Sequence, residues 1–305
     1  MSVLFDRIAT LTIGASEKEG RLFDGFRINF TVTKDLKSDA NTGKISIYNL
    51  NSDSIGLIEK KDQIAILEVG YKGMPTVIPT LDGPKVVYKP LTEILSTGNI
   101  KNVSTKTQGA DKITTFEIGD GEEKLNNSLV NKSFPPNTDS KTIINELVDG
   151  LGLIKGAVTE ATGFVFESGL TLEGKTKDRL GEVLDKADLS FSVQDGEVQI
   201  IKKGGSTNEG AILLTPETGL VGSPTRKLIK KDDGTTVEGV DCSALLNPKI
   251  KPARKIIVKS RQIDGTFTVQ KATYTGDTNQ GNFTCKLEAL WQLILMRQPL
   301  QWWTY

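Results

Sequence analysis

Apolar and polar residues alternate most regularly in residues 26–50. In the first part of this stretch every second residue is apolar: Phe26, Ile28, Phe30 and Val32. Ile45 and Ile47 repeat the pattern in the second part, and the segment between the two parts is rich in Asp, Asn, Ser and Gly, which favour turns. A period of two places one face of a strand on a core. The stretch therefore predicts an antiparallel hairpin with one face exposed to solvent.

The same period predicts further strands on both sides of this hairpin. They are expected at Ala9–Ile13, Gln63–Tyr71, Gly98–Val103 and Ile113–Ile118, with one helical turn at Ile55–Glu59. Six apolar residues are expected to share the core of one closed sheet: Leu11, Ile28, Ile45, Leu67, Ile100 and Phe116. Residues 1–124 are therefore interpreted as a β-barrel or sandwich of about 120 residues, a common domain size.

Residues 72–90 interrupt the alternation with five residues that break regular structure: Pro75, Pro79, Gly83, Pro84 and Pro90. Proline lacks the amide proton that a central strand donates, and it disrupts a helix interior. We therefore expect an exposed loop here, with at most a short strand at Lys85–Tyr88.

The period changes to that of a helix after Pro136. Apolar spacing predicts one helix at Thr138–Leu151, with an N-cap at one of its first three residues, and a second at Thr176–Ala187. Phe191–Lys202 predicts a hairpin, because its Asp195-Gly196 pair suits a type I′ turn. Residues 125–203 are therefore interpreted as a small α+β module.

Strands resume after residues 203–210, a polar segment with the composition of a linker. They are expected at Ala211–Thr215, Thr236–Ala244, Lys255–Ser260, Thr266–Thr275 and Phe283–Ala289. Hairpin turns are expected at Lys231–Gly234 and at Asp264-Gly265. Residues 204–290 are therefore interpreted as a second all-β domain.

Residues 291–305 form a hydrophobic tail that differs from the rest of the chain. The tail contains all three tryptophans, Trp291, Trp302 and Trp303, and a single charged side chain, Arg297. A segment this apolar is rarely left in water. It either packs on its own chain or docks on a neighbouring subunit, since aromatic residues are enriched in interface cores.

The overall composition narrows the classes of function. Lys plus Arg and Asp plus Glu number 38 each, so the formal net charge is zero. Specific binding of nucleic acid is not expected, because such proteins usually carry a basic excess. Histidine is absent, which excludes Ser-His-Asp and Cys-His catalysis and histidine-ligated metals. No secretory signal and no apolar run near the roughly 18 residues of a membrane span occur, so we expect a cytosolic product without a membrane partner.

The two cysteines, Cys242 and Cys285, are too few for a structural zinc site. They are compatible with a disulfide or with two buried free thiols, and the burial habit of cysteine favours the thiols. No cofactor or metal is expected.

Three kinds of polar cluster are candidates for a chemical site: a turn segment, two carboxylate pairs and a basic cluster. Residues 119–123, GDGEE, are explained by a capped turn. The pairs Glu182 with Asp185 and Glu167 with Glu173 have the residue types of a glycosidase, but chance pairs are expected among 38 carboxylates. A basic cluster is typical of a solvated strand or hairpin edge: Arg226, Lys227, Lys230 and Lys231. No set of residues therefore predicts an enzyme.

An ordered set of phrases resembles phage tail baseplate hub proteins. The first is RINFTVTKDLKSDANTGKISIYNL, followed by Val69-Gly70-Tyr71 and Gly98-Asn99-Ile100. The others are FEIGDGEEKL, VNKSFPPNTDSKTIINELVDGLGL, LGEVLDKADLSFSVQDGEVQII, TGLVGSPTRK and LLNPKIKPARKIIVKS. These phrases stand in the family's order and extend from about Ile8 to Ala289. The segment Pro75–Leu95 and the tail from Trp291 depart from the family pattern.

The resemblance implies two tube-like β-barrel domains that flank a smaller inserted module. It also implies a structural protein of the virion tail baseplate, assembled in the host cytoplasm. Three subunits would form a ring that joins the tail tube protein to the central spike protein, among other baseplate proteins, and that templates the tube. Candidate assembly contacts are, in the loop, Asp35, Leu36, Lys37 and Ser38 and, in the tail, Trp291, Trp302 and Trp303. We expect that replacing the loop, Asp35–Thr42, with a tight Asn-Gly turn leaves the fold intact and impairs assembly.

Two other interpretations remain open at this point. The first is a carbohydrate-binding or receptor-binding β-protein at the tail tip. The second is a tail-associated peptidoglycan hydrolase, which would need one of the carboxylate pairs described above.

Overall fold

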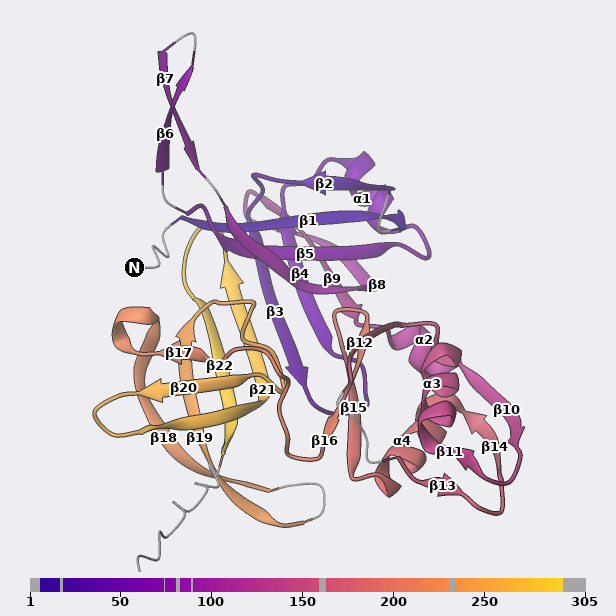
Figure 1. Cartoon of the computed structure of the whole chain (residues 1–305). Coiled ribbons are helices and arrows are strands. Elements are labelled where there is room, and N and C mark those ends of the chain that lie inside the picture. Colours follow the sequence, from indigo (N-terminus) through magenta and orange to yellow (C-terminus); the bar gives the residue numbers. More distant parts are fainter. Residues whose placement is uncertain are drawn as a thin grey trace, which may run out of the picture.

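A computed structural model describes residues 6–16, 19–73, 75–80, 83–88, 90–158, 163–230 and 234–292 (Figure 1). The protein is mainly β, with a small α+β module inserted in the chain, which confirms the predicted fold class. Among the described residues, thirteen strands form one large sheet. Its main path is β18-β19-β22-β21-β3-β4-β9-β8-β5-β1-β2, and β20 and β17 branch from β21.

The elements before the module include both strands of the predicted opening hairpin. They are β1 (Arg7–Ser16), β2 (Glu19–Phe23), β3 (Ile28–Asp35), β4 (Thr42–Tyr48), α1 (Ser52–Ile58), β5 (Ile64–Tyr71), β8 (Leu91–Gln108) and β9 (Asp111–Gly119). The alternation holds along β3, where Ile28, Phe30 and Val32 are fully buried. The predicted core residues are buried as well, except that Ile100 is partly exposed and packs against the cluster.

The α+β module surrounds its own hydrophobic cluster. Its helices are α2 (Glu122–Asn127), α3 (Ser140–Leu151) and α4 (Thr176–Lys186). Its strands are β10 (Leu129–Phe134), β11 (Thr138–Asp139), β12 (Ile154–Val158), β13 (Val165–Phe166), β14 (Leu170–Lys175), β15 (Leu189–Gln194) and β16 (Glu197–Lys202). Asp139 is the N-cap residue of α3. Asp195 and Gly196 both have positive φ, as the predicted type I′ turn between β15 and β16 requires.

The remaining elements return to the large sheet. They are β17 (Ile212–Leu214), the 3₁₀ turn η1 (Pro216–Thr218), β18 (Leu220–Lys230), β19 (Thr236–Leu245), β20 (Lys255–Lys259), β21 (Asp264–Asp277) and β22 (Phe283–Trp291). Cys242 on β19 and Cys285 on β22 are buried free thiols, which confirms the favoured alternative.

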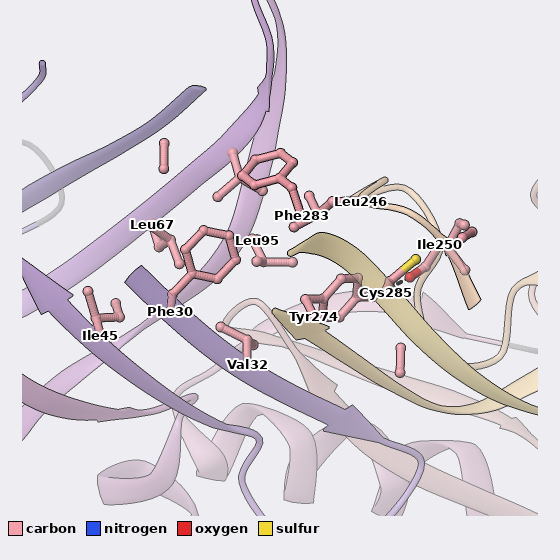
Figure 2. Close-up of a cluster of buried hydrophobic side chains, with 14 of the residues drawn as sticks. Phe30, Val32, Ile45, Leu67, Leu95, Leu246, Ile250, Tyr274, Phe283 and Cys285 are labelled. Carbon is pink, nitrogen blue, oxygen red and sulfur yellow. Dashed lines mark hydrogen bonds between the residues drawn. The ribbon is translucent and has the colours of Figure 1, made fainter. Parts of the chain in front are cut away.

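The two β halves of the chain join through β3 and β21. These strands pair antiparallel from Lys271↔Asp35 to Asp277↔Asn29. Side chains from both halves meet in one hydrophobic cluster, where the Phe30 ring packs edge-on against Phe283 with ring centroids 6.1 Å apart (Figure 2). The predicted division at residues 124, 203 and 290 into separate domains stays a prediction.

Three local expectations differ from the structure. The expected loop at residues 72–90 contains a two-stranded hairpin, β6 (Pro75–Thr80) with β7 (Gly83–Tyr88). Its prolines are tolerated because a two-stranded ribbon leaves outer amide positions without a ladder partner. The hairpin projects away from the large sheet (Figure 1).

The second difference is the turn expected at Asp264-Gly265. These residues lie inside β21 and pair with Lys259 and Val258, so the chain reverses at residues 260–263 instead. Ser260 makes that reversal, because its hydroxyl accepts hydrogen bonds from the amides of Gln262 and Ile263. The third difference is that Leu220–Lys230 is a full strand, β18. The turn expected at Lys231–Gly234 lies largely outside the described residues.

Candidate assembly surfaces

The main path of the large sheet ends in two edge strands, β2 and β18, and its branch ends in the short strand β17. Each edge strand presents an exposed apolar side chain: Leu22 on β2 is 59% exposed, and Leu228 on β18 is 69% exposed. An edge strand leaves one row of backbone amides and carbonyls without a ladder partner, and such a row is a template for another strand. The two edges are therefore candidate surfaces for strand pairing between copies or with another protein.

Arg226, Lys227 and Lys230 of the basic cluster lie on the edge strand β18, which is one of the two settings, strand edge or hairpin edge, that the sequence interpretation allowed. Lys227 contacts the carboxylates of Asp241 on β19 and Glu288 on β22, at 3.4 and 2.9 Å. The hydrogen bond that Lys227 donates to Glu288 contributes most to raising the pKa of Lys227 above its usual value. Arg226 approaches the ring of Trp291, with its guanidinium carbon 5.9 Å from the ring centroid. Lys231 lies outside the described residues.

The predicted contact loop, Asp35 to Ser38, is in part used within the chain. The carbonyl of Asp35 accepts a hydrogen bond from the side chain of Gln194 in the module, at 2.8 Å. Asn41, at the end of the loop, donates to the carbonyl of Val193 at 2.6 Å. Leu36 is half-buried, whereas Lys37 and Ser38 at the tip are exposed. A role of this loop in contacting another ring stays a prediction.

A buried polar junction lies where the loop, β9 and the module meet. The Asp120 carboxylate accepts hydrogen bonds from the backbone amides of Asp195 and Gly196, at 2.5 and 2.6 Å. Lys34, whose side chain is fully buried, forms an ion pair with Asp195. Lys251, from the segment before β20, contacts the other oxygen of Asp195 at 2.7 Å. The predicted capped turn at residues 119–123 is thus also an anchor for the Asp195-Gly196 turn.

Burial shifts the ionisation of this junction. Desolvation, followed by the nearby Asp195 carboxylate, raises the pKa of Asp120 to about 6. Desolvation lowers the pKa of Lys34, against the attraction of Asp195. Burial alone would also lower the pKa of Lys251, but Asp195 outweighs it and the net shift is upward. The junction therefore holds two lysine side chains and two carboxyl groups. Of these, the carboxyl group of Asp120 ionises near pH 6.

Trp291 ends β22 and packs on its own chain. Its ring lies edge-on to Phe267, with centroids 4.8 Å apart. A Cβ on Gly265 would come within 3.0 Å of this ring, so the glycine makes room for the indole. Trp291 also lines a surface groove of about 450 Å³ together with β20 and the start of β21. The other two tail tryptophans, Trp302 and Trp303, lie outside the described residues.

The described residues contain no cluster of His, Cys, Asp or Glu suited to hold a metal ion. Both members of one candidate carboxylate pair form ion pairs: Glu182 contacts Arg179 at 2.7 Å, and Asp185 contacts Lys203 at 2.9 Å. In the part of the chain that the structure covers, no helix is long and apolar enough to span a membrane.

Solved structures share this architecture over nearly the whole chain. The 43 kDa tail protein of prophage MuSo2 from Shewanella oneidensis aligns over 93% of this chain and 96% of its own, with a TM-score of 0.62 at 10% identity. The tail protein from Neisseria meningitidis MC58 aligns over 94% and 97%, also with a TM-score of 0.62 at 10% identity. The chain has the fold of phage tail proteins. No family model and no curated protein sequence matches it.

A secretion-system protein shares this phage tail fold too. An Escherichia coli component of the type VI secretion system, described as structurally similar to T4 bacteriophage tail proteins, aligns over 92% of this chain and 76% of its own. The TM-score is 0.53 at 9% identity. At such identities the phage tail fold is shown, and individual site residues cannot be transferred.

Proposed function

We propose that this protein is the structural hub of a tail baseplate, in a phage or a phage-like injection particle. The observation that supports this most is the tail-protein fold, which extends over more than nine tenths of the chain rather than over one part of it. A structural rather than catalytic role is part of this proposal, because the solved structures that share the fold are tail proteins.

In this proposal three copies form a ring. The two open edges of the sheet, β2 and β18, differ in sequence and lie at opposite ends of its main path. A contact between two different surfaces is heterologous, and it closes into a ring when the rotation between copies allows. Exposed Leu22 and Leu228 would add apolar contact area to such a pairing.

One face of the ring would receive the tail tube protein and the other the central spike protein. The exposed tip of the loop, Lys37 and Ser38, and the tail tryptophans Trp302 and Trp303 are the proposed contacts to these and other baseplate proteins. The ring would template the tube, so the protein would belong to the virion tail and assemble in the host cytoplasm. The fold similarity to phage tail and secretion-system proteins supports such partners but does not identify them.

Electron microscopy of the purified protein mixed with the products of its neighbouring genes tests this proposal. We expect rings of three subunits that carry tube on one face and spike on the other. Light scattering that gives only a monomer at micromolar concentration, with all of these partners present, would contradict it. Binding to glycans without affinity for tube or spike proteins would favour a receptor-binding protein instead.

A further inference from the structure

The large sheet and the α+β module have separate hydrophobic cores. One cluster of buried apolar side chains is built from the strands of the sheet and α1, and the second is built from the helices and strands of the module. Among the described elements of the module, only α2 makes a substantial contact with a strand of the sheet, β8. The module is therefore not held in place by a shared apolar core.

Polar groups link the two bodies instead. Two ion pairs, Lys101 with Glu122 and Lys177 with Asp39, join them near the surface. The larger set lies at one place, and we call it the latch: Lys34, Asp35, Asn41, Asp120 and Lys251 on the sheet side, and Gln194, Asp195 and Gly196 on the module side. Asn41 donates to the carbonyl of Val193 and to the side chain of Gln194, at 2.6 and 3.1 Å. Asp195 is held from both sides by the ammonium groups of Lys34 and Lys251. These contacts lie at the end of β15 and at the turn between β15 and β16.

The covalent connections beside the latch contain glycines in left-handed conformations. Gly121, with φ +64°, leads into α2, and Gly204, with φ +71°, follows β16. Positions of this kind absorb backbone rotation without steric cost. A body with its own core, a buried polar attachment at one turn, two further ion pairs and two such connections can move as a unit.

We propose that the α+β module is a movable part of this protein, which docks on the large sheet through the latch and undocks when the latch opens. Charged and polar interactions of this kind break without exposing an apolar core, so both bodies stay folded when they separate. In a ring of copies, such a motion would change which surface the module covers, while the strands of the large sheet stay paired. The proposal concerns a single chain and does not depend on the hub function.

The latch also gives the motion a pH dependence. The charged groups of the latch come from several elements. Asp195 and Lys34 act on Asp120 directly, and Glu197 and Glu209 act on Lys251, which pairs with Asp195. Asp120 has a pKa of about 6 when docked, against 3.8 for a solvated aspartate. A group whose pKa is raised by docking binds a proton more readily in the docked state, so docking tightens as pH falls through 6 and weakens as pH rises.

Hydrogen–deuterium exchange of the full chain at pH 7.5 tests the latch. Lys251→Met removes one cation from Asp195, and Asn41→Ala removes two hydrogen bonds to the module. In both variants we expect exchange near the Asp195-Gly196 turn to rise by about fivefold or more, a local opening easier by about 1 kcal/mol. Exchange in α3 and β22 should stay unchanged, because both cores remain folded.

Lys249→Met is the matched control. Lys249 lies two residues from Lys251 but pairs with Glu93 on the surface, at 3.2 Å, outside the latch. Its removal should leave exchange at the turn unchanged. Equal acceleration at the turn and in α3 would show unfolding instead of undocking, and no acceleration at the turn would show that the latch does not hold the module. Either result overturns the proposal.

A second measurement compares hydrogen–deuterium exchange of the wild-type chain at pH 7.5 and at pH 5.0, after correction for intrinsic exchange rates. A shift of the Asp120 pKa from 3.8 to about 6 implies about tenfold greater protection of the turn at pH 5.0. Asp120→Asn should remove this difference, because the amide side chain does not bind a proton between the two pH values. If the wild type shows equal or lower protection at pH 5.0, the acid tightening is wrong.

Discussion

Close packing at single residues joins the two β halves of the protein. Phe30 on β3 stands opposite Gly276 on β21, and the fully buried Phe30 ring occupies the space beside the glycine. A Cβ on Gly276 would lie 2.3 and 2.6 Å from two atoms of that ring and 3.0 Å from Phe283. The absence of a side chain at this position is therefore a condition for pairing the halves.

Gly276→Ala should lower the free energy of unfolding by about 1–3 kcal/mol, because the added methyl overpacks a filled core. Chemical denaturation measured by tryptophan fluorescence checks this value. Gly56→Ala is the matched control: Gly56 lies in α1, and an added methyl there would have no neighbouring atom within 4 Å. An exposed helical glycine replaced by alanine should stabilise by about 0.5–1 kcal/mol. Equal effects of the two changes would contradict this account of the core.

The sequence predicts apolar residues of the core far better than polar residues of the latch. The alternation along β3 and β5 identifies Phe30 and Leu67 as buried, and both are. The sequence pattern indicates that Lys34 is a polar residue at the end of a strand and that Asp120 is part of a turn. Both side chains are buried instead. Both positions depend on Asp195, which is distant in sequence, so no local pattern could have revealed them.

Strands and helices follow local rules over most of the chain. The Asp195-Gly196 pair produced the predicted turn, because both residues accept positive φ and the flanking strands have matching apolar faces. The same reasoning was wrong at Asp264-Gly265, where the glycine serves to fit Trp291 rather than to turn the chain. The full strand β18 was not predicted, because its charged residues and its bulge interrupt the alternation of apolar and polar residues.

The loop after β3 is an element whose expected role changes with the structure. Replacing residues 35–42 with a tight Asn-Gly turn removes the Asp35 carbonyl and Asn41 from the latch. We now expect this variant to fold with a loosened module and to lose about 1–3 kcal/mol, since buried partners remain unsatisfied. Calorimetry of this variant checks the loss.

Glycines at the exposed tip alone, Lys37→Gly and Ser38→Gly, provide the control, because both side chains are exposed to solvent. They should change stability little. Full stability of the Asn-Gly variant would show that the loop contributes nothing within the chain and would return it to the role of an external contact.

The β6–β7 hairpin should be dispensable for folding. Within the described residues its strands contact substantially only each other, and Tyr71 and Leu91 are paired across β5 and β8 beside its base. Joining the flanking segments through two glycines in place of residues 75–88 should therefore leave the thermal unfolding temperature unchanged. A marked drop would show that the hairpin supports the sheet, whereas normal folding with failed assembly would identify it as an external contact.

At the scale of the whole molecule, one sheet spans segments far apart in the chain. β3 pairs with β21, which follows it by more than two hundred residues, and the module is inserted between them. Local periodicity predicts each strand but not which edge it joins, because antiparallel pairing gains similar energy with many partners. The shared sheet and the two open edges are therefore properties that only the complete fold shows.

The open edge of β18 yields a prediction about assembly. Leu228→Glu places a charge at the exposed edge, where a neighbouring strand would have to cover it, so rings should be lost or strongly reduced. The monomer should keep its stability within about 0.5 kcal/mol, because Leu228 is already exposed. Multi-angle light scattering with the partner proteins present measures ring formation, and thermal denaturation measures the monomer.

Leu129→Glu separates edge pairing from a general effect of surface charge. Leu129 is 75% exposed, but it lies on β10 in the module rather than at an end of the large sheet. If apolar surface alone drives association, both variants should weaken the ring equally. If strand pairing at the edge drives it, Leu129→Glu should assemble normally while Leu228→Glu does not. Normal rings from Leu228→Glu would remove β18 from the interface and leave β2, the hairpin or the tail as the surface that closes the ring.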